Sequence, residues 1–522
     1  MLLDLEDSQV VGPLEEDVVI IGGGAVGLSM LADRVRRGES TMLIEAGGAG
    51  LENRSQDIVR SARSIGKLHE GVHIGRFRLL GGTTHFWGGQ LGRFDPIVFE
   101  PREQCDGLGW PFKREDVDPW YDAANTLLGM DAAISDDAGV CAKAGAQLSE
   151  DPALDYFFTR WLKEPSLAVH FAQDIASPLA KVLLHANFVG FQPLADGRHE
   201  AVVRTLGGKE VRVRARAFVL ACGTFEIVRI LQQPYVGGQA APWNSNPWLG
   251  GGYYDHIDVI VGTVRVADRK RFDRLFENVF LNGYKYNPKL KLSEAVQRRD
   301  GLLQACGAFI FSTSYKENAE NLRHFVRSLR RGKLPANWRE LPRHFLGVAR
   351  VALPMVVRYL RSNRAFHPRN AAIQLRVTTE QVPVKHSTIT RGDEHDALGM
   401  PVLVLNWAVD GREIETVAAC AENIRDLLAR EGIGTIDLDP RVTARDPAFL
   451  AEGDDTNHQM GGARIGLDPA TGVVDPDLKV FGTDDVYVAG AAVFPTSGFV
   501  NCTFTAIALA LRLNEKLRAA HG

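Results

Sequence analysis

The chain is poor in cysteine, and its few cysteines form no pattern. They are Cys105, Cys141, Cys222, Cys306, Cys420 and Cys502. No two of them form a CxxC pair, and the usual spacings of zinc and iron–sulfur ligands are absent. Because a chain of 522 residues needs no disulfide framework to stabilise its core, we expect buried, reduced thiols and no metal site.

An excess of positive charge and a long apolar run are also missing. The chain has 60 Lys and Arg against 64 Asp and Glu, a net charge of −4, which argues against a dedicated nucleic-acid binder. The most apolar run, 345–357, is interrupted by Arg350 and Pro354, and it falls short of the roughly 18 residues of a membrane span. Residues 1–17 are acidic and do not resemble a secretory signal. We expect a soluble, cytoplasmic protein without a transmembrane segment.

Near the N-terminus, a strand, a glycine-rich turn, a helix and a second strand follow one another. An apolar run suited to a fully buried strand is followed by Gly22, Gly24 and Gly27 in the spacing GxGxxG. One glycine permits the tight turn, one lets backbone N–H groups reach a pyrophosphate, and one lets the helix pack closely on the sheet. The second strand, 41–44, ends at Glu45, where a carboxylate can bind ribose hydroxyls. This unit predicts a dinucleotide site, without separating FAD from NAD.

A second glycine-rich segment, 78–89, encloses Thr, His and aromatic residues. A flexible surface loop is one interpretation, but Phe and Trp are uncommon in loops that pack on nothing, and we expect this backbone to approach a flat ligand. We also expect the strands that end at Ala221 and at Gly490–Ala491 to pass close to the cofactor. The candidate cofactor residues of the loop are Gly81, Gly82, Thr83, Thr84, His85 and Trp87.

The middle of the chain differs from the rest in charge. Residues 316–369 contain 13 Lys or Arg and three Glu, with apolar residues between the cations near helical spacing. The pattern predicts basic amphipathic helices broken at 332–335. A solvated helical face explains it, and so does a docking face for a membrane surface, an acidic partner or an electron acceptor.

The C-terminal third returns to strands and then to a helix that ends the chain. Alternating residues over 372–407 predict an antiparallel sheet separate from the first one, and 413–430 predicts a helix. His458 begins a glycine-rich stretch. Asn501 and Thr503 stand at the start of an apolar helix, whose N-terminus can face an electron-rich group.

In these motifs the chain resembles the glucose–methanol–choline (GMC) oxidoreductases, and the resemblance covers nearly its whole length. The motifs are GGGAVG followed by Glu45, LLGGTTHFWGG, the Gly-Trp-Pro segment at 109–111, FVLACGTFE, LGGGYYDH, HQMGGARIG and VYVAGAAVFPTSGFVNCTF. Within the family, the segments around His458 and Asn501 are most similar to pyranose oxidases and related bacterial sugar or glycoside oxidoreductases.

The resemblance implies FAD rather than NAD. It also implies an α/β, Rossmann-like FAD-binding domain of the GMC type and an α+β substrate domain with an antiparallel sheet. The first would be discontinuous, comprising 1–130, 186–262 and 450–522. The second would comprise 131–185 and 263–449, with the basic helical insertion 316–369 inside it.

The resemblance further implies a catalytic His–Asn pair, His458 and Asn501. Such an enzyme oxidises a hydroxyl group by transferring hydride to flavin N5 while a base takes the hydroxyl proton. A neutral His suits the base, and Asn can hold the hydroxyl in place. Pyranose oxidase tethers its flavin through a His directly before the Trp of the glycine loop. That position is Phe86 here, with His85 one residue earlier, so we expect non-covalent FAD.

Two rival functions stay open at this point. The flavoprotein could perform lyase or isomerase chemistry, or it could be a partner subunit of an electron-transfer complex with reduced catalysis. For the leading hypothesis, an oxidoreductase acting on a sugar, glycoside or other alcohol, the electron acceptor is O2 or another oxidant. We interpret His85 and His256 as structural residues rather than as the base.

Overall fold

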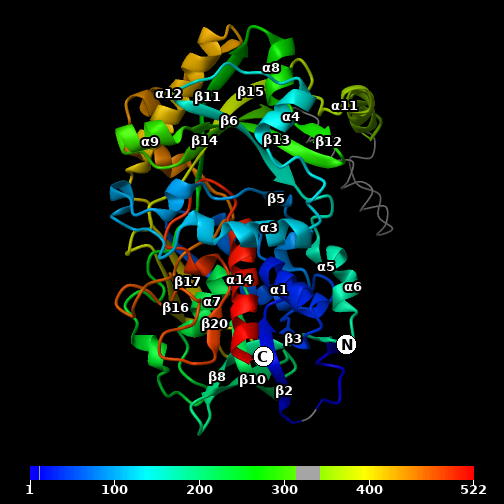
Figure 1. Ribbon diagram of the computed structural model, residues 1–522, viewed down its shortest axis with the longest axis vertical. Helices are drawn as coiled ribbons and strands as arrows, with labels where there is room; N and C mark the ends of the chain where they lie inside the picture. The colour runs from blue at the N-terminus through cyan, green and yellow to red at the C-terminus, as the bar shows by residue number, and fades with distance from the viewer. Residues whose placement is uncertain (11, 313–340, 522) are drawn as a thin grey trace.

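Two large β-sheets, one in each half of the molecule, organise the chain (Figure 1). The structure is a computed structural model that describes residues 1–10, 12–312 and 341–521. The segment 313–340, which holds part of the predicted basic insertion and its break at 332–335, lies outside the described residues. The α/β layer and the antiparallel sheet predicted from the sequence are both present.

The first sheet, in the lower half of Figure 1, is parallel except at one edge. In spatial order its strands are β1 (Leu2–Asp4), β7 (Ala180–Leu184), β3 (Thr41–Ile44), β2 (Leu14–Ile21), β10 (Glu210–Leu220), β9 (His199–Arg204) and β8 (Asn187–Pro193), with β20 (Val486–Val488) beside β10. The strand β3 and the second half of β2 are fully buried, as continuous apolar runs predict. Helices α1 (Ala25–Arg36) and α14 (Thr503–His521) pack against each other beside this sheet, so the two ends of the chain meet there.

The second sheet, in the upper half, is antiparallel. In spatial order its strands are β18 (Gly434–Leu438), β11 (Ile257–Val266), β15 (Ala372–Thr379), β14 (Ala305–Ser312), β13 (Tyr284–Leu292), β6 (Leu154–Trp161) and β5 (Gln90–Leu91), with β12 (Val279–Leu281) and β19 (Asp454–Asp455) at its margins. Helix α12 (Glu413–Arg430) has the predicted bounds and packs on β14, β15 and β18. The opposite face of the sheet is therefore available to the functional site.

A third, three-stranded sheet joins distant parts of the chain. It contains β16 (Thr388–His395), β17 (Pro401–Trp407) and β4 (Arg63–Gly66). The prediction of one antiparallel sheet over 372–407 is therefore only partly right. The first strand of that stretch, β15, enters the second sheet, whereas β17 pairs in parallel with β4, a partner that periodicity cannot reveal.

Three expected domain limits disagree with the strand pairing. The strand β7 was assigned to the substrate domain, yet it pairs with β3 in the first sheet. Conversely, β5 lies in the segment assigned to FAD binding but pairs with β6 in the second sheet. The limit at 262 falls inside β11, whose pairing with β15 and β18 continues on both sides of it. The two sheets therefore extend across these expected limits, because hydrogen-bonded strands belong to one sheet.

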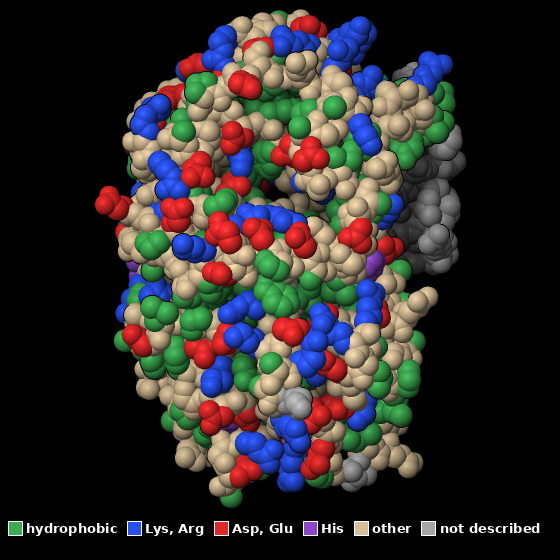
Figure 2. Space-filling view, in the orientation of Figure 1, with side chains coloured by type: hydrophobic (Ala, Val, Ile, Leu, Met, Phe, Trp, Pro, Cys, Tyr) green, Lys and Arg blue, Asp and Glu red, His purple; other side chains and the backbone are tan. Residues whose placement is uncertain are grey.

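The remaining helices connect and cover the sheets. They are α2 (Asn53–Arg60), α3 (Asp118–Leu127), α4 (Asp137–Ala144), α5 (Leu167–His170), α6 (Ala172–Ile175), α7 (Thr224–Leu231), α8 (Arg269–Phe276), α9 (Glu294–Asp300), α11 (Leu341–Ser362) and α13 (Pro440–Thr443). The face shown in Figure 2 mixes Lys and Arg with Asp and Glu and is hollowed near its middle. Within the described residues, no helix has the length and apolar character needed to cross a membrane.

Candidate cofactor site and active site

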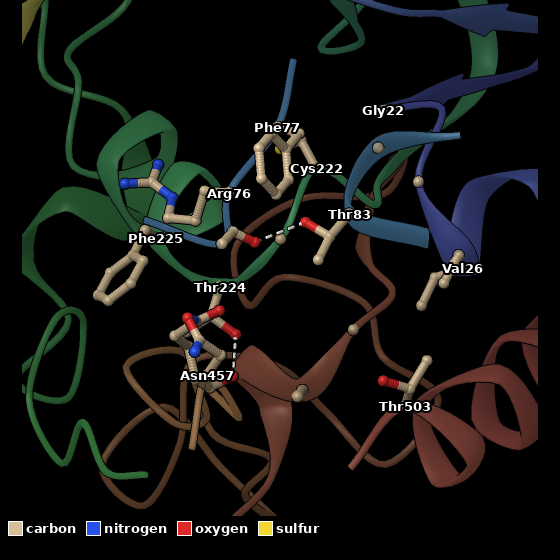
Figure 3. Close-up of a pocket in the computed structure, with 18 of the residues that line it drawn as sticks. Gly22, Val26, Arg76, Phe77, Thr83, Cys222, Thr224, Phe225, Asn457 and Thr503 are labelled. Carbon is tan, nitrogen blue, oxygen red and sulfur yellow. Dashed lines mark hydrogen bonds between the residues drawn. The ribbon is translucent and has the colours of Figure 1, made fainter. Parts of the chain in front are cut away.

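A cavity of about 680 Å³ lies between the first and second sheets. Its walls include the glycine turn after β2, the end of β3 and the segment that follows β10. Residues of β11, β13 and β15 close it from the side of the second sheet. Most of the candidate cofactor residues line it, and Figure 3 shows part of this wall.

The glycine turn has the geometry that the motif predicts. Gly22 has φ +112°, and a Cβ there would lie 2.6 Å from the Cα of Cys222. A Cβ on Gly27 would lie 1.9 Å from the carbonyl oxygen of Gly22, so only glycine lets α1 start this close to β2. By contrast, a Cβ on Gly24 would meet no atom within 4 Å, which leaves open space at the N-terminus of α1. That space is where a helix N-terminus can receive a phosphate.

Glu45 ends β3 as a buried carboxylate. Its two oxygens accept hydrogen bonds from the backbone N–H groups of Gly23 and Gly47, both at 2.8 Å. Burial raises the pKa of Glu45, and the two backbone hydrogen bonds oppose that increase. The carboxylate therefore has a fixed position beside the glycine turn, as required for binding ribose hydroxyls.

The loop at 78–89 contributes to the wall, but not through every predicted residue. Gly82, Thr83, Thr84 and Trp87 line the cavity, whereas Gly81 and His85 do not. The ring nitrogens of His85 lie 2.8 Å from the Leu80 carbonyl oxygen and 3.1 Å from the Ser166 hydroxyl oxygen. Both nitrogens are thus engaged in local contacts, which supports the structural interpretation of this histidine.

Small residues complete the cofactor wall. Ala221, Gly490 and Ala491 line the cavity, together with Thr503 at the start of α14. Gly27 does not line it, since its role is the packing of α1 described above. This wall fits a dinucleotide such as FAD, because it combines the open N-terminus of α1, the fixed carboxylate of Glu45 and the N-terminus of α14.

His458 and Asn501, which are 43 residues apart, meet at the wall of the same cavity. The Nδ2 atom of Asn501 lies 2.7 Å from Nε2 of His458. His458 lies three residues after β19, and Asn501 lies two residues before α14. The structure thus brings together the two residues that the resemblance implied.

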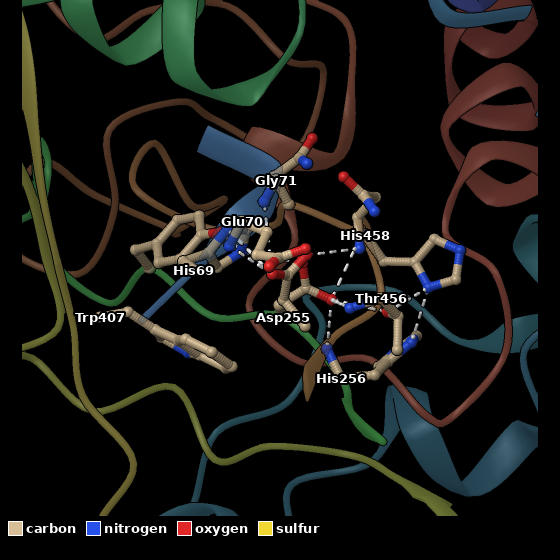
Figure 4. A network of polar contacts seen from close by, with 12 residues as sticks. His69, Glu70, Gly71, Asp255, His256, Trp407, Thr456 and His458 are labelled. Carbon is tan, nitrogen blue, oxygen red and sulfur yellow. Dashed lines mark hydrogen bonds and ion pairs between the residues drawn. The ribbon is translucent and has the colours of Figure 1, made fainter. Parts of the chain in front are cut away.

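A polar network fixes the other side of the His458 ring (Figure 4). The hydroxyl oxygen of Thr456 lies 2.7 Å from Nδ1 of His458 and 2.7 Å from a carboxylate oxygen of Asp255. The same oxygen of Asp255 accepts the backbone N–H groups of His256, at 2.7 Å, and of His458, at 3.2 Å. His69 contacts the second carboxylate oxygen at 3.1 Å. Asp255 thereby holds both the backbone and the ring of His458.

The protonation states follow from this burial and from these contacts. Burial alone would raise the pKa of Asp255, but the hydrogen bond from His69 and the nearby imidazoles bring it to about 2. Desolvation lowers the pKa of His458 below its ordinary value, and it lowers that of His256 to about 3. Near neutral pH the site therefore combines an ionised carboxylate with neutral imidazoles.

Sequence reasoning missed three residues of this network, His69, Asp255 and Thr456. Asp255 directly precedes His256, which was interpreted as structural, and Thr456 stands two residues before His458. No spacing links a side chain near 255 with one near 456, because the contact depends on the pairing of β19 with β11. His256 itself lies with its Nδ1 atom 3.1 Å from Nδ1 of His458.

Sequence reasoning also did not identify the residues of the second sheet that line the cavity. They include Asp258, Lys289, Arg376 and Thr378, which project from β11, β13 and β15. The alternation along β13 was a usable signal, because its tyrosines and leucines are buried while its lysines face the other way. The sequence alone could not show that this second face borders the cavity.

Comparisons with known proteins agree with this architecture. A family model described as FAD dependent oxidoreductase matches residues 17–242, and one described as GMC oxidoreductase matches residues 383–510. Paromamine 6'-oxidase of Streptomyces fradiae is 26% identical over 95% of this chain and 90% of its own length. C-glycoside 3-oxidase of Microbacterium trichothecenolyticum is 34% identical over 22% of this chain and 21% of its own.

Solved structures show the same fold. A variant of formate oxidase from Aspergillus oryzae superposes with a TM-score of 0.58 and 15% identity, over 98% of this chain and 99% of that one. Pyridoxine 4-oxidase from Mesorbium loti gives a TM-score of 0.55 and 16% identity, over 97% and 100%. The chain therefore combines an FAD-dependent oxidoreductase domain with a GMC oxidoreductase domain, as the motifs predict. The predicted fold class and FAD as the cofactor are thereby confirmed.

Proposed function

We propose that this enzyme oxidises a hydroxyl group of a sugar, a glycoside or another alcohol, with His458 as the base and Asn501 as its aligning partner. The observation that carries the proposal is the 2.7 Å contact between Asn501 Nδ2 and His458 Nε2 at the wall of the cofactor cavity. The names of two relatives, paromamine 6'-oxidase and C-glycoside 3-oxidase, support a sugar or glycoside substrate. FAD, when bound, supplies the acceptor for the substrate hydride.

The network behind His458 prepares its ring for proton transfer. Ionised Asp255 can only accept hydrogen bonds, so the Thr456 hydroxyl must donate to it. The oxygen of that hydroxyl then accepts a hydrogen bond from Nδ1–H of His458, which leaves the lone pair on Nε2. Nε2 takes the proton from the substrate hydroxyl, and the amide of Asn501 holds that hydroxyl in place. Asp255 and Thr456 stabilise the resulting imidazolium.

Non-covalent FAD belongs to this proposal. Phe86, at the position where pyranose oxidase has its tethering histidine, lines the cavity and has no nucleophilic atom. His85, one residue earlier, does not line it, and its ring nitrogens contact Leu80 and Ser166. Both observations support non-covalent binding.

Anaerobic titration with polyols, glycosides and aryl alcohols tests the proposed reaction. We expect at least one sugar or glycoside to bleach the flavin of the purified holoenzyme, because hydroxyl oxidation reduces it. Admission of air then separates O2 from other acceptors, since rapid return of the colour identifies an oxidase. A holoenzyme that no alcohol bleaches would contradict the proposal and favour lyase or isomerase chemistry.

The helix α11, inside the basic segment 316–369, supports a second proposal. Leu353, Val356, Val357 and Leu360 repeat at helical spacing and are 69%, 54%, 38% and 74% exposed. Residues 341–369 contain no Asp or Glu. An exposed apolar stripe on a basic helix fits contact with an anionic membrane surface, with the helix lying in the interface.

Vesicle sedimentation checks this membrane contact. We expect binding to vesicles of phosphatidylserine and phosphatidylcholine that weakens with added salt, and loss of binding in Leu353→Asp/Leu360→Asp. A protein that stays in the supernatant at low salt would contradict the membrane proposal. Self-association through α11, measured by sedimentation velocity, would instead assign the stripe to a second copy. The predicted cytoplasmic location and the discontinuous division into domains stay predictions.

A further inference from the structure

The wall of the cavity formed by the second sheet carries one cation that has no ion-pair partner among the described residues. Along β13, Lys285, Lys289 and Lys291 share the face of the second sheet opposite to the buried tyrosines and leucines. Lys289 lines the cavity together with Asp258 and Arg376 of the neighbouring strands. Trp161 and Thr378 of the same sheet also line the cavity.

Most of these charges already have partners. A carboxylate oxygen of Asp258 lies 3.2 Å from a guanidinium nitrogen of Arg376. The other oxygen accepts a hydrogen bond from the Thr378 hydroxyl. Lys291 forms an ion pair with Asp95 at 2.8 Å, and the ammonium of Lys285 stands 3.5 Å from the centroid of the Trp161 ring.

Lys289 differs from its neighbours, because it makes no ion pair among the residues that the structure describes. Because the Asp258–Arg376 pair carries no net charge, the ammonium of Lys289 is the charge on this wall that is left without a partner. Its field also reaches the reaction centre. After desolvation and the opposing effect of nearby carboxylates, Lys289 contributes to lowering the pKa of His458. A group bound to Lys289 is thus within electrostatic range of the base.

We propose that Lys289 anchors an anionic group of the alcohol substrate, and that the preferred substrates are therefore hydroxy acids of the sugar type, such as uronic or aldonic acids. This inference rests on the proposed oxidation of a hydroxyl group at His458. A carboxylate on Lys289 would leave the remaining hydroxyls of the sugar for Asp258, Thr378 and the His458–Asn501 pair. The Asp258–Arg376 pair offers both acceptors and donors to such hydroxyls.

Two readouts test the proposal, one of which does not depend on turnover. The first is the thermal shift of the holoenzyme with D-glucuronate, D-glucose and D-glucosamine at constant ionic strength. These sugars carry a negative, a neutral and a positive group on closely similar rings. We expect D-glucuronate to give the largest shift, and Lys289→Met to abolish that advantage. Lys270→Met, an exposed lysine on α8, is the matched control and should behave as the parent.

The second readout is anaerobic flavin reduction with pairs of sugar acids and their neutral counterparts. We expect the acids to show the lower apparent Kd, and Lys289→Met to raise that Kd by at least tenfold with the limiting rate of flavin reduction within about threefold. Lys289→Glu should reverse the preference towards amino sugars. If neutral sugars are preferred in both readouts, the proposal is overturned while hydroxyl oxidation stands.

A loss of the limiting reduction rate that is equal for acids and neutral sugars would also overturn it, because Lys289 would then act on the reacting oxygen. If D-glucuronate binds through Lys289 but no alcohol bleaches the flavin, the proposed oxidation has failed while the anionic site persists.

Discussion

Replacing Thr456 by Val tests whether the Asp255–Thr456–His458 network sets the tautomer of the base. Val keeps the shape of Thr but removes the hydroxyl that lies 2.7 Å from both Asp255 and Nδ1 of His458. One hydrogen bond contributes about 0.5–1.5 kcal/mol net. Since 1.36 kcal/mol changes a rate about tenfold, flavin reduction should slow by about 2- to 12-fold in Thr456→Val. Thr456→Ser keeps the hydroxyl and should stay close to the parent.

The assay is anaerobic stopped-flow reduction of the flavin, followed over pH. Loss of the hydroxyl removes an acceptor that stabilises the His458 imidazolium, so the acidic limb of the profile should move to lower pH while the plateau falls. A merely structural change would lower the plateau without moving the limb. FAD content and thermal unfolding serve as controls. The reasoning is refuted if Thr456→Val reduces flavin as fast as the parent, or if Thr456→Ser is as slow as Val.

Three further outcomes are expected. Gly27→Ala should lose both FAD and stability, because its Cβ would lie 1.9 Å from the Gly22 carbonyl oxygen, whereas Gly24→Ala should fold and only bind FAD more weakly. Flavin absorbance after gel filtration distinguishes the two variants. A Gly27→Ala protein that retains its full FAD content would be inconsistent with this packing. Acid precipitation should release all the yellow colour, and colour retained in the pellet would indicate a covalent bond near His85. Because burial lowers the pKa of His458, the rate of flavin reduction should be constant from pH 8 to 7 and fall only on acidification below its ordinary value of 6.5; a rate that keeps rising above pH 7 would contradict this.

The sequence predicts the local elements of this fold well. The glycine turn at 22–27, the helix over 413–430 and the start of α14 each depend on residues close together in the chain. Such patterns report backbone conformation and burial directly. Glu45 stands at the end of a predicted strand and Asn501 at the start of a predicted helix, whereas His458 follows from the family resemblance; all three line one cavity.

Pairing between distant strands is the part that periodicity could not provide. The pairing of β7 with β3 and the pairing of β17 with β4 both concern strands whose partners lie more than a hundred residues away. The same limit explains why Asp255 and Thr456 were missed as a unit, and why Lys289 was not recognised as a residue of the cavity. An alternating strand shows which residues share a face, but not what that face covers.

The account rests above all on His458 as the base, and His458→Ala measures this directly. General-base catalysis contributes about 100- to 10,000-fold, so anaerobic flavin reduction should slow on that scale. FAD content should be unchanged, since the glycine turn and Glu45 are untouched. His395→Ala, an exposed histidine on β16, is the matched control and should match the parent. With a substrate that bleaches the parent, a His458→Ala enzyme that bleaches within a few-fold of the parent rate would contradict the assignment.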